Sequence, residues 1–547
     1  MSLATKKPFD VLIVGSGASG GLLARDLSVA GARVLLLEAG RSIDTSKEFR
    51  GHVWPWELRR RGLDPFFTNK NEYAGRLWAD TTREPYTTDK GRFFHYARVR
   101  GTGGKTLLWA GFSYRFSPRD FKSRTLDGTG EDWPIGYDDL APYYDRVDTE
   151  IGVTGSREGL LDLPDGKFLK PLPLRCCERM LQKTATRMGI RAVHARKDAL
   201  TEAHDSRPAC HYCGHCSHGC ETHAKFSTLY TYIPWALKTG NCELVPNAFA
   251  AEILTDGRGL ARAVRYVDTI TLKWHEASAR VIIICAGAIE SARLLLLSKS
   301  RRFPAGLANS SGLVGKNLME HNQSYAGGLL AGLKAAPVRN EDGAYGHLIL
   351  PRVNTYRPSK EFIKGYSLAC GGGAPRFPGY ATRIKGFGTE FKESVKRYYT
   401  SPIGLASMIE TIPSPDNYVD LDPEIKDVYG LPAPRIHFIN GPNERAMIKH
   451  MFETAEELLK GAGAEMTWRA EGPPGESLHN VGTCKMGNDP QTSVLDPFCR
   501  AHDVKNLFVV DGSCFVSAGY VNPTITIMAI AARAGDYLVR EFKRGNL

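Results

Sequence analysis

The chain of 547 residues has no apolar run near the roughly 18 residues that a membrane span requires. Residues 1–8 are basic but carry no apolar core or cleavage site, so we expect no signal peptide. Internal repeats and low-complexity tracts are also missing. With 42% hydrophobic and 24% charged residues, the composition is typical of a globular protein. Taken alone, these features predict a soluble, cytoplasmic protein without a transmembrane segment.

Strong charge of either sign is missing too. The net charge of +12 is the difference between 71 basic and 59 acidic residues, which is a modest bias for this length. Short basic runs such as residues 59–61 are not interleaved with aromatic residues that could stack on bases. We therefore expect no nucleic-acid partner. The length exceeds one ordinary hydrophobic core and predicts two domains.

What is present begins with a nucleotide-binding βαβ unit. Residues 11–14 form a short apolar run that leads directly into the G-x-G-x-x-G turn of residues 15–20. Apolar residues then recur at helical spacing over residues 22–30. A second apolar run, residues 34–37, ends in Glu38. Strand, turn, helix, strand and acid in this order predict a dinucleotide site, whereas a lone glycine turn could be structural.

Each part of this unit has a physical role. Gly15 permits the tight turn, Gly17 lets the backbone approach a pyrophosphate, and Gly20 lets helix and strand pack closely. The helix start offers N–H groups to phosphates. Glu38 can accept hydrogen bonds from ribose hydroxyls, which argues against NADP and leaves NAD and FAD open.

Further Rossmann-type pieces lie far along the chain. Residues 281–288 read as a buried strand and turn, followed by a helix over residues 290–298. Another strand at residues 507–510 precedes Asp511, and the last helix is expected at about residues 523–542. The nucleotide domain must therefore be assembled from separated segments.

Between these pieces, residues 358–392, which are rich in Gly, Pro and basic residues, predict long loops or a lid.

Two C-terminal stretches carry residues suited to catalysis. His479 lies in a loop that contains glycines, and Asn522 directly precedes Pro523. The structural alternatives are a hydrogen-bonded loop histidine and an Asn that caps a helix whose first residue is proline.

Taken together, these motifs resemble the glucose–methanol–choline (GMC) family of FAD oxidoreductases over the whole chain. Matching stretches also occur at residues 100–109, 132–144, 287–291 and 315–321, although Ala292 stands where proline is common. The resemblance implies an α/β protein, α+β overall, with the GMC fold. A Rossmann-like FAD-binding domain built from discontinuous segments is then interleaved with a substrate-binding domain that contains an antiparallel sheet.

The resemblance also implies domain boundaries. The FAD-binding domain is expected at residues 1–45, 90–135, 225–330 and 478–547. The substrate-binding domain is expected at residues 46–89, 136–209 and 331–477, with a cysteine loop at residues 210–224.

In the family, the residue equivalent to His479 takes the substrate hydroxyl proton while hydride passes to flavin N5, and Asn522 matches its hydrogen-bonding partner. FAD should bind without a covalent bond, because Leu108 stands where some members attach the flavin through histidine. The residues expected to contact FAD come from the glycine turn, the loop near residue 100, a mid-chain strand and the C-terminal segment. They are Gly15, Gly17, Ala18, Ser19, Gly20, Glu38, Arg100, Gly103, Gly104, Thr106, Trp109, Ala250, Asp511, Gly512, Asn522, Pro523 and Thr524.

Four of the twelve cysteines are clustered, at Cys210, Cys213, Cys216 and Cys220. Their C-x2-C-x2-C-x3-C spacing is that of iron–sulfur ferredoxins, although Glu221 replaces the usual proline. No Cys-x-x-Cys pair is followed by His, which excludes haem attachment. Zinc is less natural, because structural zinc sites bring ligand pairs from separate segments. A loop of free thiols and a disulfide remain as alternatives.

With residues 54–57 and 350–352, the cysteines make the chain resemble bacterial sugar dehydrogenases of the family, in particular glucoside 3-dehydrogenases. This implies a sugar or glycoside substrate oxidised at C3 of a glucosyl unit. Electrons would pass through an iron–sulfur cluster, [3Fe-4S] in preference to [4Fe-4S], to an acceptor such as a cytochrome c. Some relatives work with a small export subunit, and such a partner would change the expected location to the periplasm.

Two other functions compete with this one. The first is a GMC alcohol oxidase or dehydrogenase that acts on a non-sugar alcohol and has structural cysteines. The second, from another class, is a cysteine-cluster electron carrier or binding module with a vestigial flavin domain, against which the intact His479 and Asn522 argue. An NAD-dependent enzyme is a more distant alternative.

Overall fold

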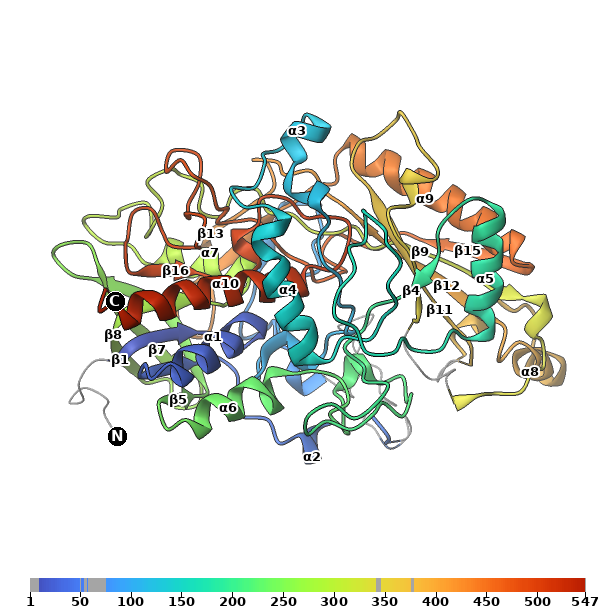
Figure 1. Cartoon of the computed structure of the whole chain (residues 1–547), viewed down its shortest axis with the longest axis horizontal. Coiled ribbons are helices and arrows are strands. Elements are labelled where there is room, and N and C mark those ends of the chain that lie inside the picture. The colour runs from blue at the N-terminus through green and yellow to red at the C-terminus, as the bar shows by residue number, and fades with distance from the viewer. Residues whose placement is uncertain are drawn as a thin grey trace.

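The computed structural model describes residues 9–49, 51–53, 57, 75–340, 346–374 and 378–546. Of the stretch at residues 54–57, only Glu57 is among them, so that part of the sugar-dehydrogenase resemblance lies outside the described residues. Two large sheets lie side by side, a mainly parallel one on the left of Figure 1 and an antiparallel one on the right.

The first sheet is built from strands that are distant in sequence. Its parallel part runs in the order β5 (Cys242–Val245), β2 (Val34–Leu37), β1 (Phe9–Val14) and β8 (Trp274–Ile284), with β16 (Leu507–Val509) also paired to β8. Continuous apolar runs form these strands because both faces of a parallel sheet are covered. The prediction of a Rossmann-like domain assembled from discontinuous segments is therefore confirmed. The exact boundaries stay a prediction.

An antiparallel extension completes this sheet. β6 (Ala248–Thr255) pairs with β7 (Ala261–Asp268), and β7 pairs with the first half of β8. Along β8, exposed and buried residues alternate up to Val281, after which every residue is buried. The burial pattern thus changes where β8 passes from the extension into the parallel core.

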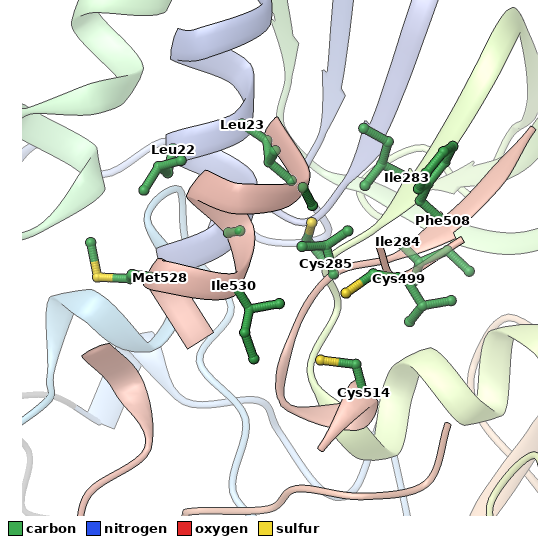
Figure 2. Close-up of a cluster of buried hydrophobic side chains, with 14 of the residues drawn as sticks. Leu22, Leu23, Ile283, Ile284, Cys285, Cys499, Phe508, Cys514, Met528 and Ile530 are labelled. Carbon is green, nitrogen blue, oxygen red and sulfur yellow. The ribbon is translucent and has the colours of Figure 1, made fainter. Parts of the chain in front are cut away.

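Helices cover the parallel sheet and enclose the main core. α1 (Ala18–Val29) packs between α6 (Tyr232–Lys238) and α10 (Thr524–Lys543), and α10 also contacts α4 (Tyr137–Ile151). α7 (Ala288–Leu297) contacts β6. Figure 2 shows side chains of α1, β8, β16 and α10 meeting in this core, together with three cysteines that lie just outside these elements. Those labelled are Leu22, Leu23, Ile283, Ile284, Cys285, Cys499, Phe508, Cys514, Met528 and Ile530.

The second sheet has six antiparallel strands. In order they are β15 (Ala464–Ala470), β9 (Tyr325–Leu330), β12 (Pro402–Ile409), β11 (Tyr366–Gly372), β10 (Leu348–Leu350) and β4 (Val193–His194). α5 (Cys176–Arg187) and α9 (Pro442–Gly461) pack on it through a separate hydrophobic core (Figure 1). Buried polar groups connect it to the C-terminal segment, where the Ser367 hydroxyl donates to the Tyr520 carbonyl at 3.0 Å. The expected interleaved domain with an antiparallel sheet is present.

The prediction of long loops over residues 358–392 was wrong. β11, an interior strand, lies within this stretch, and α8 (Gly388–Arg397) begins there. Glycine is needed in β11 because a Cβ on Gly372 would lie 2.5 Å from the Pro402 carbonyl oxygen and 3.0 Å from Cys177 Sγ.

The remaining elements are short. A three-stranded sheet contains β13 (Tyr418–Lys426), β14 (Pro432–His437) and β3 (Thr87–Thr88), and the other helices are α2 (Thr45–Glu48) and α3 (Ser123–Asp127). Among the described residues, we find no helix with the length and apolar character needed to cross a membrane.

Candidate active site and cofactor cavity

A cavity of about 240 Å³ lies where the glycine turn, the loop near residue 100 and the C-terminal segment meet. Most of the residues predicted to contact the cofactor line it. They are Gly15, Gly17, Ala18, Ser19, Glu38, Arg100, Gly104, Thr106, Trp109, Ala250, Asp511, Gly512, Pro523 and Thr524. Gly20, Gly103 and Asn522 do not line this cavity, whereas His479 does.

The glycine turn has the geometry that a phosphate site requires. Gly15 adopts a φ of +99°, and a Cβ there would lie 2.5 Å from the Cys285 carbonyl oxygen. A Cβ on Gly20 would lie 1.9 Å from the Gly15 carbonyl oxygen, so close helix–strand contact demands glycine. A Cβ on Gly17 would meet nothing within 4 Å, and no side chain caps α1 at Gly17. The N-terminus of α1 can therefore receive an anion.

Glu38 supports the turn as well as lining the cavity. Its carboxylate accepts a hydrogen bond from the Ser16 hydroxyl at 2.6 Å and another from the Gly40 N–H at 2.7 Å. The Gly103 N–H donates to the same Ser16 hydroxyl oxygen at 2.9 Å. Gly103 thus ties the loop near residue 100 to the glycine turn without facing the cavity.

Arg100 is engaged by protein carboxylates. It donates to Glu84 from Nε at 2.9 Å and from Nη2 at 2.5 Å. Burial alone would raise the pKa of the neighbouring Glu290, but Arg293, Arg98 and Arg100 outweigh it and lower that pKa to about 2. Several paired guanidinium groups therefore border the cavity wall, and Arg98 and Glu290 were not predicted from the sequence.

The two predicted catalytic residues meet although 43 positions separate them. His479 Nε2 lies 3.0 Å from Asn522 Nδ2. Helix α10 begins at Thr524 and has no side-chain cap. The expectation that Asn522 caps the last helix was therefore wrong, because Pro523 occupies the cap position; the Asn522 amide nitrogen lies against His479.

A second histidine, His321, holds the other side of the His479 ring. His321 Nδ1 lies 2.9 Å from His479 Nδ1, and His321 Nε2 lies 2.8 Å from the Gly519 carbonyl oxygen. A carbonyl oxygen only accepts, so Nε2 of His321 carries the hydrogen. In a neutral ring its Nδ1 then accepts from Nδ1–H of His479. This arrangement leaves the lone pair on His479 Nε2.

Both rings are neutral near pH 7. Burial, followed by the influence of His321 and Lys105, lowers the pKa of His479 well below its usual range. Burial lowers the pKa of His321 to about 4. His479 can therefore accept a proton, as a general base must.

Glu320 positions the loop that carries His479. Its carboxyl group accepts from the His479 N–H at 2.8 Å and also contacts the side chains of Ser477 and Asn480. Burial raises the pKa of Glu320 to about 8. Glu320 and His321 lie in the family-like stretch of residues 315–321, and the adjacent acid and histidine there are the signal that indicates a site role.

The four clustered cysteines come together around a second, small cavity of about 30 Å³, which Lys197 and Lys225 also line. Lys225 Nζ donates to the Trp109 carbonyl at 2.8 Å and to the Thr106 carbonyl at 3.3 Å. Because Thr106 and Trp109 also line the cofactor cavity, one short segment separates the two cavities.

Without a metal, burial raises the pKa of the Cys210 thiol to about 12 and that of Cys213 to about 11. Burial also lowers the pKa of Lys197 to about 8. The buried lysines would favour thiolates or an anionic group at this cavity.

Two sequence-family models, both described as GMC oxidoreductase, match the chain, one over residues 9–323 and the other over residues 413–531. The chain belongs to the GMC oxidoreductase family. This family binds FAD, which decides between the two dinucleotides, and the chain is an oxidoreductase.

Similar proteins span nearly the whole chain. It is 31% identical to 2-methyl-1,2-propanediol dehydrogenase of Mycolicibacterium austroafricanum, over 97% of this chain and 95% of that protein. It is 28% identical to the fructose dehydrogenase large subunit of Gluconobacter japonicus, over 98% of each. The solved structure of pyridoxine 4-oxidase from Mesorbium loti has a TM-score of 0.64 at 19% identity and covers 97% of this chain and 99% of its own. That last likeness establishes the fold.

Proposed function

We propose that this GMC oxidoreductase is a dehydrogenase that oxidises a secondary hydroxyl of a sugar or glycoside to a ketone, with C3 of a glucosyl unit as the favoured position. Electrons then pass to an external acceptor. The observation that carries this proposal is the neutral His479, whose Nε2 lone pair lies at the cofactor cavity within reach of the Asn522 amide.

In the proposed reaction, the substrate hydroxyl donates its proton to His479 Nε2. The Asn522 amide holds the hydroxyl oxygen and does not compete for the proton. His321 keeps the Nδ1 hydrogen of His479 away from the substrate side. FAD, when bound, supplies the acceptor for the hydride that leaves the same carbon.

The fit of FAD to this chain rests on the cavity. Three features of the glycine turn suit a pyrophosphate. Nothing lies within 4 Å of a Cβ placed on Gly17, and no side chain caps the start of α1. A Cβ on Gly15 or Gly20 would collide with backbone atoms, so the turn requires glycine at both positions. The N-terminus of α10 begins two residues after Asn522 and would bring its positive end to the catalytic side of the cavity.

The substrate class can be tested by anaerobic absorbance spectra of the purified protein, recorded before and after addition of glycosides and simple diols. We expect glucosides to bleach the flavin bands, with a ketone as the product. The likeness to 2-methyl-1,2-propanediol dehydrogenase favours a second candidate, a dehydrogenase of non-sugar alcohols. Bleaching by diols alone would establish that candidate and refute the sugar proposal.

FAD should be bound without a covalent bond. Leu108 packs with Phe49, Leu77, Val99 and Leu107 in a small hydrophobic cluster and offers no nucleophile. Acid precipitation should therefore release all of the yellow colour into the supernatant. Colour that stays in the pellet, or a fluorescent band on a denaturing gel, would contradict this.

We also propose that the cysteine cavity holds an iron–sulfur cluster, of the [3Fe-4S] type in preference to [4Fe-4S]. The convergence of Cys210, Cys213, Cys216 and Cys220 supports it, as does the contact of Lys225 with the cofactor-side segment. Such a cluster transfers single electrons, which would match a two-electron flavin to a one-electron acceptor.

A Cys216→Ser variant should test the cluster, because both buried lysines flank Cys216. We expect loss of the iron, the acid-labile sulfide and the EPR signal. Transfer to an external acceptor should slow strongly, while reduction of the flavin by substrate stays normal. Cys176→Ser, on the exposed side of α5, is the matched control and should change nothing. Wild-type protein without iron after anaerobic purification would refute the cluster.

The proposed partners follow from the same relatives. The fructose dehydrogenase chain is named a large subunit, which implies that it assembles with others. We propose that this chain likewise works with a small export subunit and donates electrons to a cytochrome c, which would place it in the periplasm.

A further inference from the structure

A distant segment packs against the cysteine loop. A Cβ on Gly219 would lie 2.3 Å from the Phe49 ring, and one on Gly51 would lie 2.5 Å from His215 Nδ1. The imidazole of His52 lies between two histidines of the loop. Its ring is stacked 5.1 Å from that of His211 and 5.2 Å from that of His215, measured between centroids.

Three potential metal ligands lie close together there. His52 Nε2 is 3.0 Å from His211 Nε2. One ring nitrogen of each histidine and Cys213 Sγ all lie within 4.8 Å of one another. They come from two segments that are 159 positions apart in the chain, which is the usual origin of a structural metal site.

Glu221 of the cysteine loop holds His52 in this arrangement through a hydrogen bond to the backbone and a contact with the ring. Its carboxylate accepts from the His52 backbone N–H at 3.0 Å and lies 2.6 Å from His52 Nδ1. Since a carboxylate accepts, Nδ1 carries a hydrogen, and in the neutral ring the Nε2 lone pair then faces His211. Metal-binding histidines usually have such a carboxylate on the second ring nitrogen.

The other three thiols have different neighbours. The side chain of Lys197 interacts electrostatically with the thiols of Cys216 and Cys210. Lys225 acts on Cys216 and Cys220, and its backbone N–H donates to Cys220 Sγ at 3.4 Å. Two buried lysines therefore line the cavity beside these three sulfurs.

Cys213 is placed differently. Its Sγ is grouped with a ring nitrogen of His52 and one of His211, and these three atoms all lie within 4.8 Å of one another. This geometry assigns Cys213 to the two histidines.

We propose that His52, His211 and Cys213 bind one divalent metal ion of the zinc class, with a fourth position open to water. Cys210, Cys216 and Cys220 are then the set that holds a three-iron cluster, and this second part rests on the proposed function.

The donor set suits such an ion. Imidazole and thiolate are the ligands that zinc prefers, at about 2.0–2.1 Å for nitrogen and about 2.3 Å for sulfur. A tetrahedral site with those bond lengths separates its two nitrogens by about 3.3 Å, and the imidazole nitrogens here are 3.0 Å apart. The bound ion would clamp residues 51–53 onto the cysteine loop.

Metal analysis of the anaerobically purified holoenzyme tests the site. We expect about one zinc per chain, and Co²⁺ added to zinc-depleted protein should give a sulfur-to-cobalt charge-transfer band. His52→Ala and His211→Ala should lose the zinc and the band, yet keep iron, sulfide and FAD. His218→Ala, in the same loop, is the control and should retain all of them.

The thiols are separated by a reciprocal pair of variants. Cys213→Ser should lose the zinc and keep the three-iron EPR signal, whereas Cys216→Ser should do the reverse. Absence of zinc from the wild type together with no cobalt band would overturn the metal site. Loss of iron in Cys213→Ser would overturn the division of the cysteines. A wild type with zinc but no iron would refute the proposed cluster and leave the zinc site standing.

Discussion

Replacement of His479 by alanine is expected to slow the oxidation of bound substrate by about 10²–10⁴-fold, the usual contribution of a general base. The imidazole holds its Nε2 lone pair at the cavity wall, and alanine offers no acceptor for the hydroxyl proton. The measurement is the rate of flavin reduction in an anaerobic stopped-flow experiment at saturating substrate. FAD content should stay normal, because His479 supplies only part of the cavity wall.

The pH dependence of the wild type gives a second readout. A base must be unprotonated, and the lowered pKa of His479 keeps it so at pH values below the ordinary histidine range near about 6.5. The reduction rate should therefore stay constant from neutral pH into the mildly acidic range and fall only in stronger acid. His502→Ala is the control, because His502 contacts the Ser493 hydroxyl and does not line the cofactor cavity. A His479→Ala variant that reduces its flavin at the wild-type rate would place the base elsewhere.

The parallel sheet could be predicted from sequence because the apolar composition of its strands shows that they are buried. A strand that is covered on both faces is apolar throughout, and this holds for residues 11–14 of β1 and for the buried half of β8. β11 carries no such signal. Gly372 is needed because Pro402 and Cys177 approach from neighbouring elements, and those contacts depend on the completed sheet.

The catalytic pair shows a similar limit. The resemblance named His479 and Asn522, but local rules also allowed Asn522 to cap the last helix. The structure directs that amide to His479 instead, over a separation of 43 positions. The preference of Asn522 for a helix cap is therefore overridden by its contact with His479, which the local sequence does not indicate.

For the cysteine loop too, one part was predictable from the local sequence and another was not. The spacing of its four thiols is a local property and was visible at once. Lys197 and His52 lie outside the loop, and their approach to it depends on tertiary packing. The charge environment of each thiol therefore could not be read from the motif.

His321 should contribute to catalysis because it keeps the ring hydrogen of His479 on Nδ1. Replacement by leucine removes the acceptor for Nδ1–H of His479, and the freed ring can then carry its hydrogen on Nε2, where it no longer acts as a base. A wrong tautomer costs roughly 10⁴-fold where a buried carboxylate sets it. Because His321 is a neutral partner, we expect a smaller loss, about 10²-fold in kcat with KM little changed.

A conservative variant distinguishes tautomer control from packing. In His321→Gln, the amide oxygen can accept from His479 Nδ1–H and the amide nitrogen can donate to the Gly519 carbonyl, which reproduces both bonds of His321. This variant should recover most of the rate lost in His321→Leu. In ¹⁵N-histidine NMR spectra, with His479→Ala as the subtraction reference, His479 should carry its hydrogen on Nδ1 in the wild type and the Gln variant, but not uniformly in the Leu variant. Equal loss of kcat in both variants, with an unchanged tautomer, would reduce His321 to a packing residue. The result would then leave the Asn522 amide as the group that orients the base.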